Sequence, residues 1–211
     1  MKITLQDIGR RYNRDWIFRH IDYTFSVGHK YAVLGPNGSG KSTLLKVLCG
    51  NLTPSEGKIT YHHEGAEVAV DRIFQHLSIA APYVELIEDL TLHEMIAFHF
   101  KFKNFQKGFD QESLLDLLGL NGSVNKEIRY FSSGMKQRVK LALACCSDSA
   151  LVFLDEPTSN LDEKGEAWYL ELIERTMSED RLLIVCSNQV KEYGFCDQHI
   201  SISDYKKTEA V

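Results

Sequence analysis

The most constraining feature of this chain is a glycine-rich run that matches the phosphate-loop pattern GxxxxGK[ST]. Its glycines allow a tight turn that points successive backbone N–H groups toward an anion. The Lys41 ammonium suits terminal phosphates, and the Ser42 hydroxyl suits a Mg²⁺ ion. We therefore predict that a nucleoside triphosphate is held by Gly35, Pro36, Asn37, Gly38, Ser39, Gly40, Lys41, Ser42 and Thr43.

The residues around this run predict a strand before it and a helix after it. Residues 31–34 are apolar, and the apolar residues from 44 to 48 recur at helical spacing until Gly50. Two further apolar runs, 151–154 and 182–186, are typical of buried parallel strands. Together these segments predict an α/β fold with a mainly parallel sheet that binds its ligand at the carboxyl edge.

Other segments predict two smaller parts within one domain covering residues 1–211. Antiparallel strands are expected at 3–10, 17–25, 58–61 and 67–74. Helices are expected between 90 and 120, where Thr91 and Glu94 have capping-box spacing, and Asp110 precedes a helix ending near Gly119. A third helical stretch is expected at 132–150. We predict an antiparallel β subdomain and a helical subdomain at approximately 83–148.

Composition argues against several classes of protein. The net charge of -5, from 24 basic and 29 acidic residues, gives no reason to expect a nucleic-acid partner. No apolar stretch approaches the roughly 20 residues that span a bilayer, and the amino end has no signal-peptide core, so we expect a cytosolic protein. The five cysteines show no C-x-x-C spacing, which predicts reduced, mostly buried thiols with neither a disulfide framework nor a zinc site.

A second group of motifs lies between residues 131 and 162. The segment Phe131 to Arg138, FSSGMKQR, resembles the LSGGQ signature of the ATP-binding cassette (ABC) family. It precedes the segment LVFLDEP, residues 151–157, by the spacing of that family, and residues 159–162 resemble the family's D-loop, with Asp162 as its acidic residue. The resemblance extends from Tyr12 to about Asp197. Phe131, Ser133 and Met135 depart from the Leu, Gly and Gln of the signature.

The resemblance implies the P-loop NTPase core of an ABC nucleotide-binding domain. Asp155 ends a strand, where a carboxylate can help Ser42 to hold Mg²⁺, and Glu156 is placed to activate a water aimed at the γ-phosphate. In the family, the residues matching Ser132, Ser133 and Gly134 close on the ATP of the opposite subunit, which implies a head-to-tail dimer. Tyr12, 29 residues before Lys41, matches the aromatic that stacks on adenine. Trp16 is the rival, and ordinary packing is the alternative for Tyr12.

Two family residues are missing. The Q-loop glutamine is expected within Ala80 to Tyr83, where Pro82 predicts a stiffer loop, and Glu85 and Glu88 are weak substitutes. The switch histidine is replaced by Asn188, which can donate a hydrogen bond to the γ-phosphate but cannot become cationic. We therefore expect that Lys41, Glu156 and Asn188 form the catalytic set and that ATP hydrolysis is slow.

An aromatic run with interspersed lysines has two interpretations. It is either part of the core or part of an interface with a membrane protein, because the helical subdomain of the family borders a groove that receives a helix. The run consists of Phe98, Phe100, Phe102, Phe105 and Phe109 with Lys101, Lys103 and Lys107.

The resemblance implies an ATP-binding and ATP-hydrolysing subunit that energises transport through a separate membrane permease. Such a protein works as a dimer with ATP and Mg²⁺, in the cytoplasm at the inner face of the membrane. Similar small bacterial cassettes pair with haem-exporter-like or drug-exporter-like permeases. Two alternatives remain: a soluble ABC-type ATPase that remodels ribosomes or DNA, and a slow, nucleotide-gated clamp that is not coupled to transport.

Overall fold

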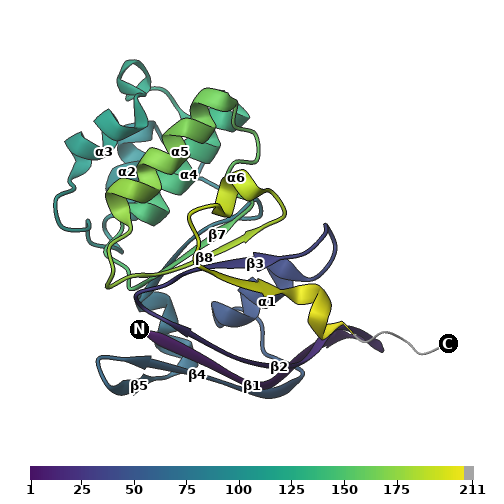
Figure 1. Cartoon of the computed structure of the whole chain (residues 1–211). Helices are drawn as coiled ribbons and strands as arrows, with labels where there is room; N and C mark the ends of the chain where they lie inside the picture. The colour runs from purple at the N-terminus through teal and green to yellow at the C-terminus, as the bar shows by residue number, and fades with distance from the viewer. Residues whose placement is uncertain (207–211) are drawn as a thin grey trace.

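The computed structural model describes residues 1–206 and has two β-sheets with helices packed around them (Figure 1). The central sheet is parallel, and its strands in spatial order are β6 (Leu77–Ala80), β7 (Leu151–Asp155), β8 (Leu182–Ser187), β3 (Lys30–Leu34) and β9 (Gln198–Ser201). The second sheet is antiparallel, in the order β2 (Asp15–Ser26), β1 (Lys2–Tyr12), β4 (Glu56–His63) and β5 (Ala66–Val68). The predicted α/β class with an added antiparallel sheet is confirmed.

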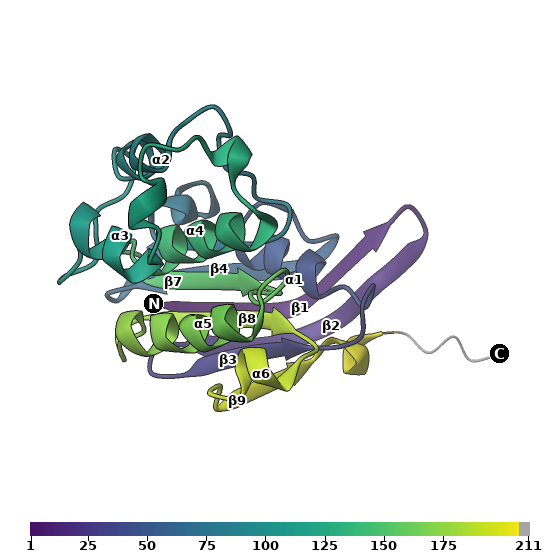
Figure 2. The same ribbon diagram turned by 90° about the horizontal axis from the view of Figure 1, so that it is seen from above.

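Helices cover both faces of the parallel sheet. On one face lie α4 (Ser133–Cys145) and α5 (Glu163–Thr176), which run along the strands in Figure 2. On the other face lie α1 (Lys41–Leu48) and then the antiparallel sheet (Figure 1). The remaining helices, α2 (Leu92–His99) and α3 (Gln111–Leu118), pack on the α4 side, and the short α6 (Val190–Tyr193) follows β8.

The alternating side chains of the parallel strands divide the core in two. On β7, Val152 and Leu154 belong to the cluster shared with α4 and α5, whereas Leu151 and Phe153 belong to the cluster shared with α1 and the antiparallel sheet. Every residue of β7 is buried. A strand covered on both faces has to be apolar throughout, which explains the unbroken hydrophobic run in the sequence.

Two predicted helix boundaries are confirmed by their capping contacts. The Thr91 hydroxyl accepts from the N–H of Glu94 at 3.2 Å, and the Glu94 carboxylate accepts from the N–H of Thr91 at 2.9 Å, which is a complete capping box at the start of α2. Gly119 ends α3 with a φ of 63°, a left-handed backbone that glycine adopts readily. These local signals therefore fix the start of α2 and the end of α3.

Other boundaries differ from the expectation. The predicted strand at 67–74 is a strand only as far as Val68, and Val70–Gln75 forms a 3₁₀ turn in which adjacent Asp71 and Arg72 break the alternation that a strand needs. The helix predicted at 132–150 ends at Cys145, and the residues after it connect to β7. Strands β6 and β9 and helix α5 were not predicted, because the first two are only four residues long and α5 is rich in charged residues.

All five cysteines are buried, in agreement with the prediction that most of them are. Burial raises the pKa of Cys145 to about 12, so this thiol stays protonated at neutral pH. Among residues 1–206, no helix has the length and apolar character needed to cross a bilayer.

Candidate nucleotide site

The phosphate loop joins the end of β3 to the start of α1, and two of its glycines occupy positions that no side chain fits. At Gly40, which has a φ of 109°, a Cβ would lie 2.4 Å from the Ile17 side chain. At Gly35, a Cβ would lie 2.6 Å from Ser39 Oγ. The loop is therefore pressed against β2 through Ile17, and its close turn depends on glycine at both positions.

Lys41 lies in the first turn of α1 and folds back over the loop. Its Nζ donates to the carbonyl oxygens of Gly35 at 2.8 Å and Pro36 at 3.3 Å, and only 4% of the residue is exposed. The Ser39 hydroxyl is also buried and has no hydrogen-bond partner within residues 1–206. A buried ammonium and an unpartnered hydroxyl beside the N-terminus of a helix suit a phosphate group.

Asp155 ends β7 and is almost completely buried, with 1% exposed. Burial raises the pKa of Asp155; a hydrogen bond from Ser42 opposes this shift, and the nearby Glu156 carboxylate adds to it. Its Oδ1 has no hydrogen-bond partner among the described residues. An orphaned carboxylate oxygen next to the Ser42 hydroxyl is a donor set that fits a Mg²⁺ ion carried by a nucleotide.

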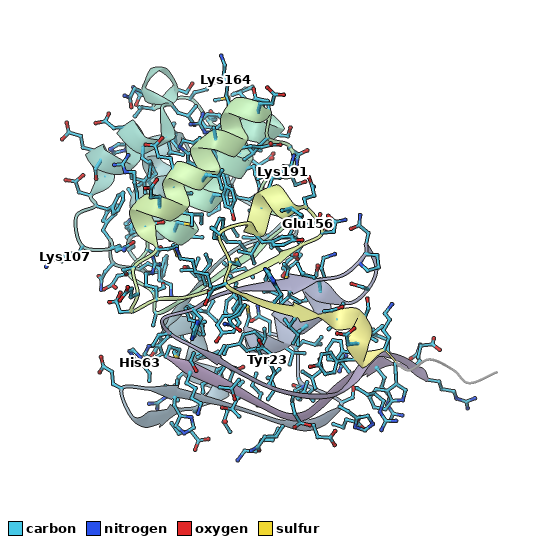
Figure 3. All side chains as sticks on the ribbon, in the orientation of Figure 1. Tyr23, His63, Lys107, Glu156, Lys164 and Lys191 are labelled. Atoms are coloured by element: carbon cyan, nitrogen blue, oxygen red, sulfur yellow. The ribbon has the colours of Figure 1, made fainter. Side chains whose placement is uncertain are left out.

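Glu156 follows Asp155 and lies in the same hollow as the phosphate loop. Its backbone has a φ of 46°, a left-handed conformation that is uncommon outside glycine, and its N–H donates to the carbonyl oxygen of Cys186 on β8 at 2.9 Å. The hollow has a volume of about 200 Å³ and is lined by Glu156, Ile17 and residues 37–43. Figure 3 labels Glu156 at this edge of the sheet. The structure thus brings together a carboxylate and the phosphate loop, although β8 separates β7 from β3.

Asn188 follows β8 and contacts the phosphate loop directly. Its Nδ2 donates to Oδ1 of Asn37 at 3.1 Å. Asn188 therefore lies next to a residue that lines the hollow of the phosphate loop. Its amide can donate a hydrogen bond at this position but cannot carry a charge.

The two candidate aromatics lie near the tip of the β1–β2 hairpin. Tyr12 is 45% exposed, and the Arg10 guanidinium lies 4.8 Å from the centre of its ring. Trp16 is flanked by the guanidinium groups of Arg11 and Arg19, at 5.4 and 4.1 Å from its ring centre. Trp16 is half-buried, so Tyr12 is the more exposed of the two aromatics.

The segment Ala80 to Tyr83, where the sequence comparison predicted a Q-loop glutamine, begins at the carboxyl end of β6, at the same edge of the sheet. Tyr83 places its ring 4.3 Å from Lys46 Nζ on α1, and burial, then the Asp155 charge, raise the pKa of its phenol. Glu88 pairs with Lys136 at 2.5 Å, and Glu85 lines a different hollow, so neither carboxylate lies in the hollow of the phosphate loop. Tyr83 is the side chain of this segment that reaches α1, and the sequence offered no motif to identify it.

The signature residues form the start of α4. Ser132 is the N-cap, and its hydroxyl accepts from the N–H of Met135 at 3.2 Å. The helix begins at Ser133, so Gly134 lies in its first turn. A Cβ on Gly134 would lie 2.9 Å from the carbonyl oxygen of Asn160, so the signature and the D-loop are in close contact.

Signature and D-loop share one open hollow of about 410 Å³. It is lined by residues 132–135, Arg138, 160–162, Lys164 and Gly165. Asp162 caps α5 by accepting from the N–H of Gly165 at 2.8 Å. None of these residues lines the hollow of the phosphate loop. Within one chain, the two predicted halves of the nucleotide site are separate.

The aromatic run is divided between core and surface. Phe100 stacks on Phe105 at 3.5 Å between ring centres, and these two and Phe109 pack against the core. Phe98 and Phe102 are 39% and 74% exposed, with their rings in edge contact at 5.3 Å. The run therefore lies partly in the core and partly on the surface, and an interface with a membrane protein stays a prediction for its exposed residues.

Comparison with known proteins identifies the family. The model of the ABC transporter family matches residues 18–159, which include the phosphate loop, the signature and both carboxylates. The chain belongs to the ABC transporter family. The cytochrome c biogenesis ATP-binding export protein CcmA of Brucella abortus is 31% identical to this ABC cassette over 188 residues, 89% of this chain and 86% of that protein. The energy-coupling factor transporter ATP-binding protein EcfA1 of Thermotoga maritima is 30% identical over 97% of the cassette and 79% of its own length.

Solved structures show the same fold. An ABC transporter ATP-binding protein from Pyrococcus furiosus superimposes with a TM-score of 0.81 over 98% of this cassette and 100% of that chain, at 22% identity. A bacterial ABC transporter cassette that was solved as a dimer superimposes with a TM-score of 0.78 over 94% and 93%, at 20% identity. The cassette is therefore an ATP-binding and ATP-hydrolysing subunit of an ABC transporter, the leading interpretation of the sequence.

Proposed function

We propose that two copies of this cassette bind head to tail, with ATP held between the phosphate loop of one copy and the signature of the other. The observation that carries this proposal is the separation of the two hollows within one chain. Ser132, Ser133 and Gly134 present the N-terminus of α4, an anion-binding feature, in a hollow that no phosphate-loop residue lines. In the dimer, the ATP bound by the phosphate loop of the second copy places its phosphate in this hollow.

In this composite site, Lys41 binds the terminal phosphates, and Ser42 and Asp155 hold Mg²⁺. The ion supplies charge neutralisation at the phosphates when it is bound. Glu156 orients the attacking water and accepts its proton. Asp162 supports the opposite subunit's site through the D-loop, and Tyr12 stacks on the adenine. The buried, unpartnered oxygen of Asp155 and the position of Glu156 beside the phosphate loop support these assignments.

Hydrolysis is slow in the isolated protein, because Asn188 takes the place of a residue that can become cationic. An amide donor brings one hydrogen bond to the γ-phosphate but no positive charge, so it stabilises the charge of the transition state less than an imidazolium donor would. The contact of Asn188 with Asn37 supports a place for this amide at the rim of the phosphate hollow.

The cassette docks on a separate membrane permease, which holds it at the inner face of the membrane. The docking surface we assign contains a hollow of about 290 Å³ between the core and the helical part, lined by residues that include Phe74, Leu86, Met95 and Lys103. Phe74 is 61% exposed there, and Lys103, the neighbour of the exposed Phe102 in the chain, donates to the carbonyl oxygen of Phe74 at 2.8 Å. This contact supports a surface with exposed aromatic groups for a partner. The division into one domain with a helical subdomain at 83–148 stays a prediction, as does the absence of a nucleic-acid partner.

The dimer can be tested with the Glu156→Gln variant, which keeps ATP binding while slowing hydrolysis. We expect its mass in size-exclusion chromatography with light scattering to change from 24.1 kDa to twice that value when ATP and Mg²⁺ are added, and to stay unchanged with ADP. Adding Gly134→Asp to Glu156→Gln serves as the control and should block the change, because it places a carboxylate at the anion site. A monomer at saturating ATP contradicts the proposal.

A further inference from the structure

The fold contains one buried carboxylate that the proposed mechanism does not use. Glu192 lies in α6, between Lys191, which Figure 3 labels, and Tyr193. It is 0% exposed, and acidic side chains are rarely buried to this extent without a specific partner. The Tyr169 hydroxyl on α5 donates to its backbone carbonyl oxygen at 2.9 Å, which anchors this turn of α6.

Each oxygen of the Glu192 carboxylate faces a different loop. Its Oε1 accepts from the N–H of Thr158 at 2.9 Å and from the Thr158 hydroxyl at 2.5 Å. Its Oε2 accepts from the hydroxyl of Ser187, which also accepts from the N–H of Gln189 at 2.8 Å. All of these neighbours donate, so both oxygens of the buried carboxylate accept hydrogen bonds.

Glu192 thus joins the loop after β7 to the loop after β8. These loops contain Glu156 and Asn188, the two residues proposed to act at the γ-phosphate. Thr158 follows Glu156 by two residues, and Ser187 immediately precedes Asn188. The strands before these loops are paired as far as Glu156, whose N–H donates to the carbonyl oxygen of Cys186. Beyond that bond, the direct hydrogen bonds between 157–162 and 187–192 in the described part of the chain all run through Glu192.

We propose that Glu192 is a positioning residue that holds Glu156 and Asn188 in one arrangement around the γ-phosphate. Through Ser187 and Asn188 the connection continues to Asn37 of the phosphate loop. The inference rests on the proposed roles of Glu156 and Asn188. Glu192 itself does not line the hollow and is not a catalytic residue. Misplacing a reacting group by about 1 Å can cost roughly a hundredfold in rate, so a carboxylate that fixes two loops affects turnover more than nucleotide binding.

The first test separates positioning from general stability. In purified protein, Glu192→Ala should lower kcat about tenfold or more while the KM for ATP and the affinity for ADP stay within about twofold. Glu192→Gln should restore kcat to within about threefold of the original, because its amide oxygen can accept from Thr158 and its NH₂ can donate to the Ser187 hydroxyl. Equal losses in Glu192→Ala and Glu192→Gln, or parallel losses of kcat and ADP affinity, overturn the proposal.

A second set of variants keeps the test valid if Glu192→Ala folds poorly. Thr158→Val and Ser187→Ala each remove one hydroxyl that contacts Glu192, and each should lower kcat. Their effects should combine to less than the product, because both act through one carboxylate. Thr176→Val is the matched control: its hydroxyl is buried and donates to the carbonyl oxygen of Leu172 at 2.6 Å, outside these loops.

The outcomes distinguish this inference from the proposed function. If Asn188→Ala lowers turnover but Thr158→Val and Ser187→Ala do not differ from Thr176→Val, Glu192 is only a structural residue and the inference is wrong. If Asn188→Ala and Glu156→Gln have no effect on turnover, the proposed catalytic roles themselves are wrong. A double variant whose loss of kcat equals the product of the Thr158→Val and Ser187→Ala losses also contradicts a shared positioning role.

Discussion

At the scale of one residue, Asp155 is a carboxylate that serves the proposed site and lowers the stability of the nucleotide-free fold. Its carboxylate is buried beside Glu156, and one of its oxygens has no hydrogen-bond partner among residues 1–206. Burial raises its pKa above the value of about 3.9 that the unfolded chain has. Between these two pKa values the folded state binds more protons, so stability falls as the pH rises through that window. At neutral pH the ionised carboxylate therefore destabilises the nucleotide-free fold.

Replacing this carboxylate should stabilise the protein and inactivate it. We expect Asp155→Asn to raise the Tm of the nucleotide-free protein at neutral pH, by about 2 to 4 °C for each kcal/mol gained. The gain should shrink as the pH falls toward about 4, where the unfolded carboxyl is also protonated. ATP turnover should be lost. Asp71→Asn, at an exposed aspartate, is the control and should show no gain in Tm. A lower Tm for Asp155→Asn at neutral pH disagrees with this account.

At the same scale, we propose that Asn188 limits the speed of hydrolysis. Asn188→Ala should lower kcat by about tenfold, the size of one hydrogen bond to a charged group. Asn188→His should raise kcat, because an imidazolium adds positive charge near the γ-phosphate. The gain should decline as the pH rises above about 6.5, while the original protein shows no such decline. Turnover that is unaffected by both substitutions removes Asn188 from the mechanism.

Two residue roles were beyond sequence reasoning for a physical reason. The phosphate-loop glycines were predictable because their turn and phosphate contacts are local in sequence. Tyr83 and Glu192 belong to no motif, and they contact residues that only the fold brings close: Lys46 for Tyr83, and Thr158 for Glu192. Tyr12 is intermediate, because its spacing from Lys41 could be counted but its contact with Arg10 could not.

At the scale of elements, one arginine joins several pieces that only meet in the folded chain. Arg181, just before β8, is 6% exposed and donates to backbone carbonyl oxygens of Cys145, Ser147, Ser149 and Thr176 and to the side chain of Gln106. It thereby fixes the ends of α4 and α5 and the connection to β7. Burial lowers its pKa, but an arginine stays charged at neutral pH.

Arg181→Lys should destabilise the fold, because an ammonium has no planar fork to reach these carbonyls. We expect the free energy of unfolding in urea to fall by about 2 to 4 kcal/mol, since buried acceptors lose their partners. Arg175→Lys, at an exposed i,i+4 pair with Glu171, should change it by less than about 0.5 kcal/mol. Equal effects of the two substitutions contradict the role given to Arg181.

At this scale, the sequence predicted the helices and strands that local residues determine, and it missed the strands that form by pairing with the sheet. Long apolar runs gave β3, β7 and β8, and capping residues gave the ends of α2 and α3. β6 and β9 are four residues each and exist because the parallel sheet offers them an edge. The 3₁₀ turn at Val70–Gln75 replaced an expected strand because polar residues interrupt the alternation there.

At the scale of the whole molecule, the arrangement of the two hollows supports the proposal that the cassette acts as a dimer. The phosphate loop, Asp155 and Glu156 lie together at the carboxyl edge of the parallel sheet, while the signature lies at the start of α4 in a separate hollow. Sequence motifs predicted both sets of residues, but motif order along the chain says nothing about whether they meet. Their separation within one chain is a property of the fold.

Mixing two inactive variants tests this central claim most directly. Lys41→Ala disables the phosphate loop but keeps the signature, and Gly134→Asp disables the signature but keeps the phosphate loop. Each variant alone should show almost no ATP turnover. Mixed in equal amounts, they can form a dimer in which one composite site is intact, so turnover should return to about a quarter of the original rate by random pairing. A mixture that stays as inactive as its two components contradicts the claim that ATP is hydrolysed between two copies of this chain.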